Sequence, residues 1–161
     1  MSLSSLKDYL DKHNVKYIVV SHSPAYTAQG IAALAHIPGK ELAKTVVVKL
    51  DGKLVMAVLP ASFHVDLGRL KEATKAKAAE LASEDEFKHR FPECETGAMP
   101  PFGNLYGLPT NVDKNLAEQD YIVFEAGTHT DAIKISYRDY EKIVKPKVED
   151  LAVKLQPMKG A

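Results

Sequence analysis

Lys44 is the first residue whose type and position could support chemistry. It begins the β-branched, apolar run "KTVVVKL", residues 44–50. A lysine at the rim of a sheet usually keeps its ammonium group in water while its stem covers apolar surface. Held at the mouth of a pocket, the same group could bind a phosphate or polarise a carbonyl. Its ordinary pKa of about 10.4 makes it no general base near neutral pH unless it is desolvated. The pattern leaves both interpretations open.

A second candidate is the segment "GAMPPFG", which runs from Gly97 to Gly103. Adjacent prolines remove backbone donors and do not fit a helix or a central strand, so we expect a rigid loop. The glycines permit positive φ and a close approach of the backbone to a ligand. Their amides could donate to a carbonyl oxygen that gains charge during a reaction. A plain connector with Phe102 and Leu105 in the core is the alternative.

The third candidate is His129, in the segment "AGTHTDA" from residue 126 to residue 132. Gly127 and Thr128 precede it, and apolar β-type runs lie on either side, so we expect a turn between two strands. The histidine could be an exposed turn residue or an acid–base group beside a ligand. His22, in "SHSPAY", offers a similar choice between a hydrogen-bonded turn residue and the wall of a pocket.

Other kinds of reactive site are not indicated. No His, Cys, Asp and Glu residues follow the spacing of a recognisable metal motif, so we predict no metal site. The chain contains no Gly-x-Ser-x-Gly elbow and no phosphate-binding P-loop. The single cysteine, Cys94, has no nucleophile signature around it.

Composition limits the partners. Among 161 residues, Lys and Arg number 21 and Asp and Glu number 21, which gives a formal net charge of zero. A protein that holds nucleic acid alone usually carries a basic excess. We therefore expect no DNA partner, and any RNA contact to be small or shared. One cysteine, no apolar leader and no membrane-length apolar run predict a cytoplasmic protein without a membrane partner.

A β-hairpin is the clearest element that would position Lys44. Asp51-Gly52 is a favoured two-residue turn, because both central residues adopt positive φ. Pairing outward from this turn sets Lys44 opposite Leu59 and on the same face as Val46 and Val48. The opposite face is apolar too, which predicts strands that are buried on both sides.

The remaining periodicity predicts a single α/β (α+β) domain, with a mixed, mostly antiparallel sheet flanked by helices. We expect the domain to span 1–147 and a C-terminal tail to span 148–161. The helices are expected over 4–13, 27–37, 65–74, 83–91 and 136–144, and the further strands over 16–22, 77–82, 108–113, 121–126 and 131–136.

Three of these segments occur together in a known family. "AKTVVVK", "GAMPPFG" and "FEAGTHTDAI", in this order, resemble the YbaK family of aminoacyl-tRNA deacylases, which is related to the editing domain of bacterial prolyl-tRNA synthetase. The resemblance covers residues 3–146 and implies a compact mixed sheet flanked by helices. It also implies hydrolysis of the ester that joins a wrong amino acid to a tRNA 3′ end. No metal or organic cofactor is implied.

The resemblance also assigns roles to the candidates. Lys44 would hold the terminal nucleotide or the ester, and Gly97 would lie on the loop that contacts the aminoacyl end. His129 matches a histidine that only some branches of the family carry. No protein nucleophile is visible, so a water activated by a substrate hydroxyl or by backbone groups would attack. The expected substrate-binding residues are His22, Tyr26, Met99, Pro100, Phe102, Gly103, Gly127 and Thr128.

One departure from the family bears on substrate choice. Many relatives carry Ser or Thr where this chain has Pro100, so a hydroxyl and a backbone donor are missing here. Met99 and Phe102 would then make the amino acid pocket more apolar. The sequence predicts a trans-editing deacylase whose partners are the aminoacyl-tRNA acceptor end and, as a further candidate, a synthetase. A non-catalytic aminoacyl- or nucleotide-binding module of the same fold is the alternative, and an interaction domain without a ligand is a third.

Overall fold

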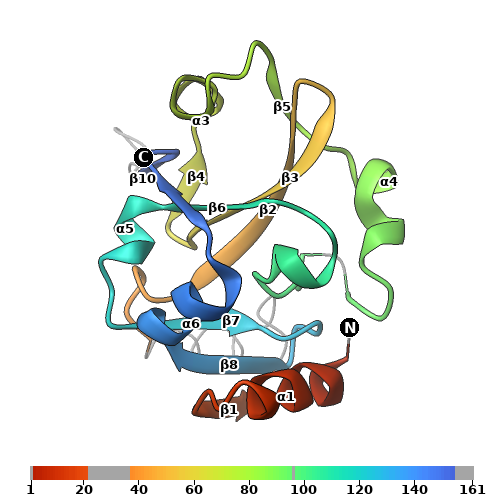
Figure 1. The fold of residues 1–161 in the computed structure, drawn as a ribbon, viewed down its shortest axis with the longest axis vertical. Coiled ribbons are helices and arrows are strands. Elements are labelled where there is room, and N and C mark those ends of the chain that lie inside the picture. The colour runs from red at the N-terminus through yellow and green to blue at the C-terminus, as the bar shows by residue number, and fades with distance from the viewer. Residues whose placement is uncertain (1, 22–36, 96, 155–161) are drawn as a thin grey trace, which may run out of the picture.

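The computed structural model describes residues 2–21, 37–95 and 97–154 (Figure 1). The helix expected over 27–37 lies outside the described residues except for its last position. Within the described ranges the chain forms one five-stranded sheet, one three-stranded sheet and one two-stranded sheet, with helices packed around them. Five of the seven strand pairings are antiparallel, which confirms the expected mixed α/β architecture.

The five-stranded sheet is the centre of the fold. Its strands, in spatial order, are β5 (Ala79–Leu81), β2 (Ala43–Leu50), β3 (Lys53–Pro60), β6 (Thr110–Asp113) and β9 (Lys147–Glu149). β5 and β3 each run antiparallel to β2, and β6 and β9 continue the sheet in parallel with β3. In Figure 1 the β2–β3 hairpin crosses the molecule from the three-stranded sheet at one end to its own turn at the other.

The hairpin has the register that the sequence predicts. Leu50 pairs with Lys53 and Lys44 pairs with Leu59, with Asp51 and Gly52 at φ 51° and 81° in the turn. The Asp51 carboxylate also accepts hydrogen bonds from the amides of Lys77 and Ala78, each at 2.9 Å. The turn therefore positions the chain that leads into β5.

The three-stranded sheet consists of β1 (Tyr17–Ser21), β8 (Asp131–Ser136) and β7 (Tyr121–Glu125), all antiparallel. It joins the five-stranded sheet next to the start of β2. There Leu42 bridges to Val123, and the Val123 amide donates to the Glu41 carbonyl at 2.8 Å. The third sheet pairs β4 (Phe63–Val65) with β10 (Ala152–Lys154).

Several helices begin at residues whose side chains cap the first turn. Ser2, Asp66 and Ser136 accept from backbone amides at the starts of α1, α3 and α6, and Ser83 forms a capping box with Glu86. The helices are α1 (Leu3–Lys12), α3 (Leu67–Thr74), α4 (Glu84–Phe87), α5 (Lys114–Ala117) and α6 (Tyr137–Val144), with short 3₁₀ turns η1 (Lys88–Arg90) and η2 (Gly103–Leu105).

Both faces of the β2–β3 hairpin are buried, as predicted. Val47, Met56 and Val58 pack into the larger core cluster with the loop after α4, α1 and α6. The smaller cluster covers the other face, and its fully or largely buried members are Val48, Val55, Ala57, Leu59, Phe63, Leu70, Leu151 and Ala152.

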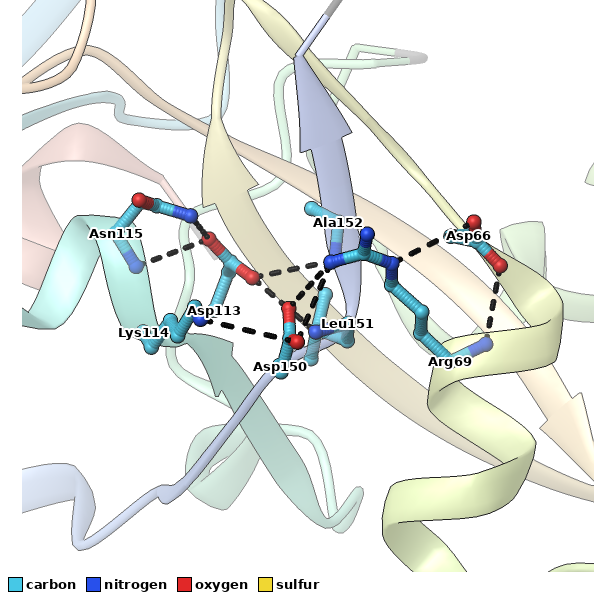
Figure 2. Close-up of polar contacts among 8 residues, drawn as sticks. All are labelled: Asp66, Arg69, Asp113, Lys114, Asn115, Asp150, Leu151 and Ala152. Carbon is cyan, nitrogen blue, oxygen red and sulfur yellow. Dashed lines mark hydrogen bonds and ion pairs between the residues drawn. The ribbon is translucent and has the colours of Figure 1, made fainter.

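Residues 147–154 lie within the fold, so the boundary expected at residue 147 falls inside β9. Figure 2 shows how the last segment is held: the fully buried Asp113 carboxylate accepts from the amides of Leu151 and Ala152, each at 3.2 Å. Beside it, Arg69 Nη1 donates to the Asp150 carboxylate at 3.0 Å. These anchors are polar and distant in sequence, so apolar periodicity does not reveal them.

Candidate active site at the edge of β2

The proline-rich loop is anchored in the core. Pro100, Pro101 and Phe102 are buried, and the Phe102 ring makes edge-on contacts with Phe124 and Tyr140 at centroid distances of 5.3 and 5.6 Å. The buried Tyr140 hydroxyl donates to the Pro101 carbonyl at 2.7 Å. Phe102 thus lies where the connector interpretation of the loop places it, and it supports the loop from behind.

Gly103 serves the folding of the same loop. Its carbonyl accepts from the amides of Tyr106 and Leu108, each at 2.9 Å. A Cβ atom here would come within 2.6 Å of the Leu108 carbonyl oxygen and would collide with the Thr110 side chain. Only glycine fits this crowded position.

Gly97 and His129 lie next to each other in the structure. Gly97 has φ 83°, a conformation that glycine adopts without strain. A Cβ atom at this position would meet His129 Cε1 at 3.6 Å. The proline-rich loop and the turn between β7 and β8 are therefore direct neighbours.

Backbone hydrogen bonds lock the loop to the turn. The Glu95 amide donates to the Gly127 carbonyl at 2.8 Å, and the Gly127 amide donates to the Ala98 carbonyl at 2.9 Å. The His129 amide donates to Glu95 Oε2 at 2.8 Å. Thr128 is engaged within the turn, where its hydroxyl donates to Asp131 Oδ2 at 2.9 Å. The positions of Gly97 and His129 are thus fixed relative to each other.

A carboxylate holds the His129 ring. Nδ1 lies 3.3 Å from each oxygen of the Glu125 carboxylate, and the two side chains are 28% and 19% exposed. A carboxylate on one ring nitrogen sets the orientation and tautomer of a histidine. The roles of Glu95 and Glu125 were not predicted, although Glu125 lies within "FEAGTHTDAI" and Glu95 lies two positions before "GAMPPFG". The contact of Glu95 with His129 joins residues 34 positions apart, which sequence spacing does not reveal.

A small cavity, here called the edge cavity, lies beside Gly97. Its volume is about 210 Å³, and it is lined by Thr45, Val46, Val47, Leu81, Ala82, Phe87, Gly97 and Met99. Consecutive residues of β2 line it, so it wraps around the edge of the strand rather than lying over one face. Most of its wall is apolar, and Met99 occupies the position next to the loop prolines.

The edge of β2 is open at this cavity. β5 pairs only with residues 48–50, and the Ala82 amide extends the ladder to the Val47 carbonyl at 3.1 Å. Backbone groups of alternate residues point to opposite neighbours in an antiparallel ladder. The amide and carbonyl of Thr45 therefore point to the same side as those of Val47, beyond the residues of β2 that pair with β5.

Lys44 lies directly before Thr45. Its side chain is partly buried on the same face as Val46 and does not line the edge cavity itself. Burial lowers the pKa of the Lys44 ammonium group from its ordinary value. Within 37–95 and 97–154, no carboxylate forms an ion pair with it. A partly desolvated cation without a partner is typical of a functional position.

His22 and Tyr26, two of the expected substrate-binding residues, lie outside the described residues. Among the residues that are described, no three His, Cys, Asp or Glu side chains gather as metal ligands would. None of the helices described is long and apolar enough to cross a membrane.

The family of the chain follows from comparison with known proteins. Residues 22–143 match the family described as "Aminoacyl-tRNA editing domain". The chain therefore belongs to the aminoacyl-tRNA editing domain family, which confirms the resemblance that the three motifs indicated. The match includes Lys44, Gly97 and His129.

Individual relatives agree with this assignment. The chain is 26% identical over 143 residues to the prolyl-tRNA editing protein ProX of Acetoanaerobium sticklandii, and the match covers 84% of this chain and 86% of that protein. It is 32% identical over 109 residues to the proline–tRNA ligase of Leuconostoc citreum, covering 65% of this chain but only 18% of the ligase.

Solved structures share the fold. The crystal structure of the hypothetical protein APE2540 has a TM-score of 0.79 and 19% identity, with 92% of this chain and 99% of that chain covered. A structure described as a candidate trans-editing enzyme for prolyl tRNA synthetase has a TM-score of 0.75 and 17% identity, with coverage of 96% and 97%.

Proposed function

We propose that this protein hydrolyses the ester between a mismatched amino acid and the 3′ end of a tRNA, and that it acts in trans. One observation carries the proposal: the loop at Gly97 is held by hydrogen bonds to the His129 turn beside the edge of β2, and the partly buried Lys44 is the second residue of that strand. Family membership and the match to 86% of ProX support the same reaction.

The reaction suits a site of this kind. The first pocket of a synthetase rejects a smaller amino acid by only about 1–3 kcal/mol per methylene, so a second pocket must remove the errors. An aminoacyl ester is already activated, and a few positioned groups are enough to hydrolyse it. Neither a protein nucleophile nor a metal is required by this proposal.

Lys44, Gly97 and His129 have separate roles in this reaction. The Lys44 ammonium group binds the phosphate or the ester carbonyl of the terminal nucleotide. The Gly97 amide donates to the carbonyl oxygen as it gains negative charge. His129, oriented by Glu125, positions the attacking water and takes its proton, and it returns this proton to the ribose oxygen as the ester bond between that oxygen and the acyl carbon breaks. Backbone groups and a substrate hydroxyl complete the contacts of the water.

The edge cavity accommodates the amino acid side chain. A volume of about 210 Å³ with a wall of valine, methionine and phenylalanine suits a small, uncharged side chain. The open amide and carbonyl of Thr45 supply hydrogen bonds for the α-amino group and the ester. The name of the ProX relative suggests tRNA for proline as the nucleic-acid half of the substrate.

A synthetase is a further partner in this proposal. The formal net charge of zero gives the protein little general attraction for RNA. Delivery of the charged tRNA by proline–tRNA ligase would compensate, and the reaction would take place in the cytoplasm, where tRNA is charged.

A panel of mischarged tRNAs tests the proposal. We expect a tRNA for proline that carries a small, wrong amino acid to lose it well above the rate in buffer. Lys44→Ala should abolish that rate. If the protein binds the panel but accelerates none of its members, the non-catalytic binding module is the correct reading instead.

A further inference from the structure

A second and larger cavity lies at the other end of the hairpin. Its volume is about 570 Å³, and it lies where β2 ends, where β3, β6 and β9 begin, and where α3 and α6 end. Leu50 lines this cavity and lies six positions after Lys44 in β2, so about 20 Å of strand separates Lys44 from the cavity. We call it the lysine cavity, after Lys75, Lys145 and Lys147 in its wall.

Two buried oxygen atoms in this wall have no partner in the described part of the chain. Asn111 is only 5% exposed, and its Oδ1 accepts no hydrogen bond; Glu149 Oε2 is buried and unpaired as well. A buried acceptor without a donor costs about 1–3 kcal/mol, so such groups are rare unless a ligand or water satisfies them. β6 and β9 pair in register, which sets Lys147 beside Asn111 and sets Glu149 further along the same face.

The three lysines come from three separate elements. Lys75 is the C-cap of α3, Lys145 is the C-cap of α6, and Lys147 begins β9, and all three side chains are exposed. No carboxylate within the described ranges pairs with any of them. Lys75 and Lys145 have φ of 60° and 53°, at helix ends where glycine is the usual residue. The fold thus gathers three uncommitted cations around two unpaired acceptors.

We infer that the lysine cavity binds a ribose phosphate. The lysines pair with the phosphate, while Asn111 and Glu149 accept hydrogen bonds from the ribose hydroxyls. A bare inorganic anion would be repelled by the Glu149 carboxylate, and a simple amine would be repelled by the three lysines. A ligand that joins an anion to neighbouring hydroxyl donors can bind the lysines and both acceptors at once.

The occupant is the sugar–phosphate backbone of the tRNA, at a distance from the ester. This step rests on the proposed function, which places the tRNA 3′ end near Lys44. Successive phosphates of an RNA chain lie a few ångströms apart, so the distance of about 20 Å from Lys44 to the lysine cavity corresponds to several nucleotides. The 2′-hydroxyl is the group that distinguishes RNA from DNA, and the two acceptors are suited to read it.

The first test removes Lys145, which follows α6, and Lys147, which begins β9. Binding of uncharged tRNA is measured by fluorescence anisotropy over a range of salt concentrations. Lys145→Ala with Lys147→Ala should weaken binding about tenfold and lower the salt slope by about 1 for each lysine. Lys12→Ala with Lys16→Ala removes the same charge from another part of the surface and should have a much smaller effect. Equal losses for the two pairs would overturn the inference.

The second test addresses the unpaired acceptors. Asn111→Leu keeps the branched shape of the side chain and removes the unsatisfied polar atom, so the melting temperature should stay the same or rise. The wild-type protein should bind an RNA oligonucleotide several-fold more tightly than the DNA of the same sequence, and the variant should lose this preference. A stable variant that keeps the preference would show that Asn111 does not read the ribose.

A third arm separates the sources of the ribose phosphate. Titration with AMP, followed by NMR, should shift resonances around the cavity only weakly. Tight AMP binding together with tRNA binding that is insensitive to the lysine pair would overturn the tRNA backbone as the occupant. Because uncharged tRNA is the probe, binding that depends on these lysines in a protein without deacylase activity would refute the proposed function alone.

Discussion

Lys44, which we propose binds the substrate, opposes the stability of the fold. Its ammonium group is partly buried, and burial lowers its pKa because nothing in the described ranges compensates the charge. A cation in this situation disfavours folding as long as it is charged. The Asp51-Gly52 turn sets the register of the hairpin, and this register pairs Lys44 with Leu59 and so fixes its place in the sheet.

Lys44→Met should therefore separate stability from activity. The apolar side chain removes the desolvation of the charge, so we expect the melting temperature to stay the same or rise. Deacylation should fall by about 10² or more, the loss that is typical when one electrostatic contact to the reacting centre is removed. Thermal denaturation and single-turnover kinetics measure the two effects. A melting temperature several degrees lower would mean that Lys44 is a structural residue.

Glu125→Gln tests the orientation of His129. The amide keeps the size of the side chain but no longer holds the ring as a carboxylate does, so kcat should fall about tenfold or more while KM changes little. Glu118→Gln, at an exposed position, is the matched control. An unchanged kcat would remove His129 and Glu125 from the mechanism.

At the scale of elements, the proline-rich loop is a rigid support. Its prolines and Phe102 are buried, and Gly97, at the start of the loop, lies beside the His129 turn. Rigidity of this kind holds a backbone donor in place before the substrate arrives. The doubled proline thus has a packing role that the sequence did not reveal, since Tyr140 follows 39 positions after Pro101.

Tyr140→Phe should loosen this support. It removes the hydrogen bond to the Pro101 carbonyl and leaves that buried acceptor unpaired, which costs about 1–3 kcal/mol of unfolding free energy. Chemical denaturation measures the loss, and hydrogen exchange should report faster opening of residues 97–106. Unchanged stability would mean that water replaces the tyrosine hydroxyl.

The short helix α4 is held to β2 by an ion pair that depends on pH. Lys49 Nζ lies 2.6 Å from Glu86 Oε2, and this contact, together with the Ser83 cap, lowers the pKa of Glu86 to about 2. A carboxyl whose pKa is lower in the folded state stabilises the fold above its ordinary pKa of 4.5. That contribution is lost as the pH falls from 4.5 towards about 2. Denaturation at several pH values should show this loss in the wild type and a smaller one in Glu86→Gln.

Local signals were the part of the fold that the sequence could predict. The hairpin, the capped helices and the turn at His129 depend on neighbouring residues, so their patterns are readable. The cluster around Asp113 depends on contacts between residues 38 and 39 positions apart. β9 pairs with β6, and β10 pairs with the still more distant β4, so no local periodicity marks these two strands. The contact of His129 with Glu95 was missed for the same reason, since Glu95 lies 34 positions away.

At the scale of the whole molecule, one buried carboxylate joins several elements. Asp113 ends β6, caps α5 and accepts from the amides that lead into β10 (Figure 2). Asp113→Ala would leave these amides unpaired in the interior. We expect a loss of several kcal/mol of unfolding free energy, because each buried group without a partner costs about 1–3 kcal/mol. Asp120→Ala, at an exposed position, should have little effect in the same denaturation experiment.

The two cavities lie at opposite ends of the β2–β3 hairpin, so a tRNA that reaches both would lie along the molecule. Clustering of lysines at one end supplies a local attraction that the zero net charge does not suggest. A protein of this design discriminates by holding the acceptor strand while a small apolar pocket selects the amino acid.

The most direct test of the proposed active site is the rate at which the protein deacylates a tRNA for proline that carries a small, wrong amino acid. With enzyme in excess, we expect rapid first-order loss of the amino acid with the wild type. For Lys44→Ala we expect a rate close to that in buffer, together with a melting temperature close to that of the wild type. Equal rates for the two proteins would contradict the central claim that the β2 edge, the Gly97 loop and Lys44 form the active site.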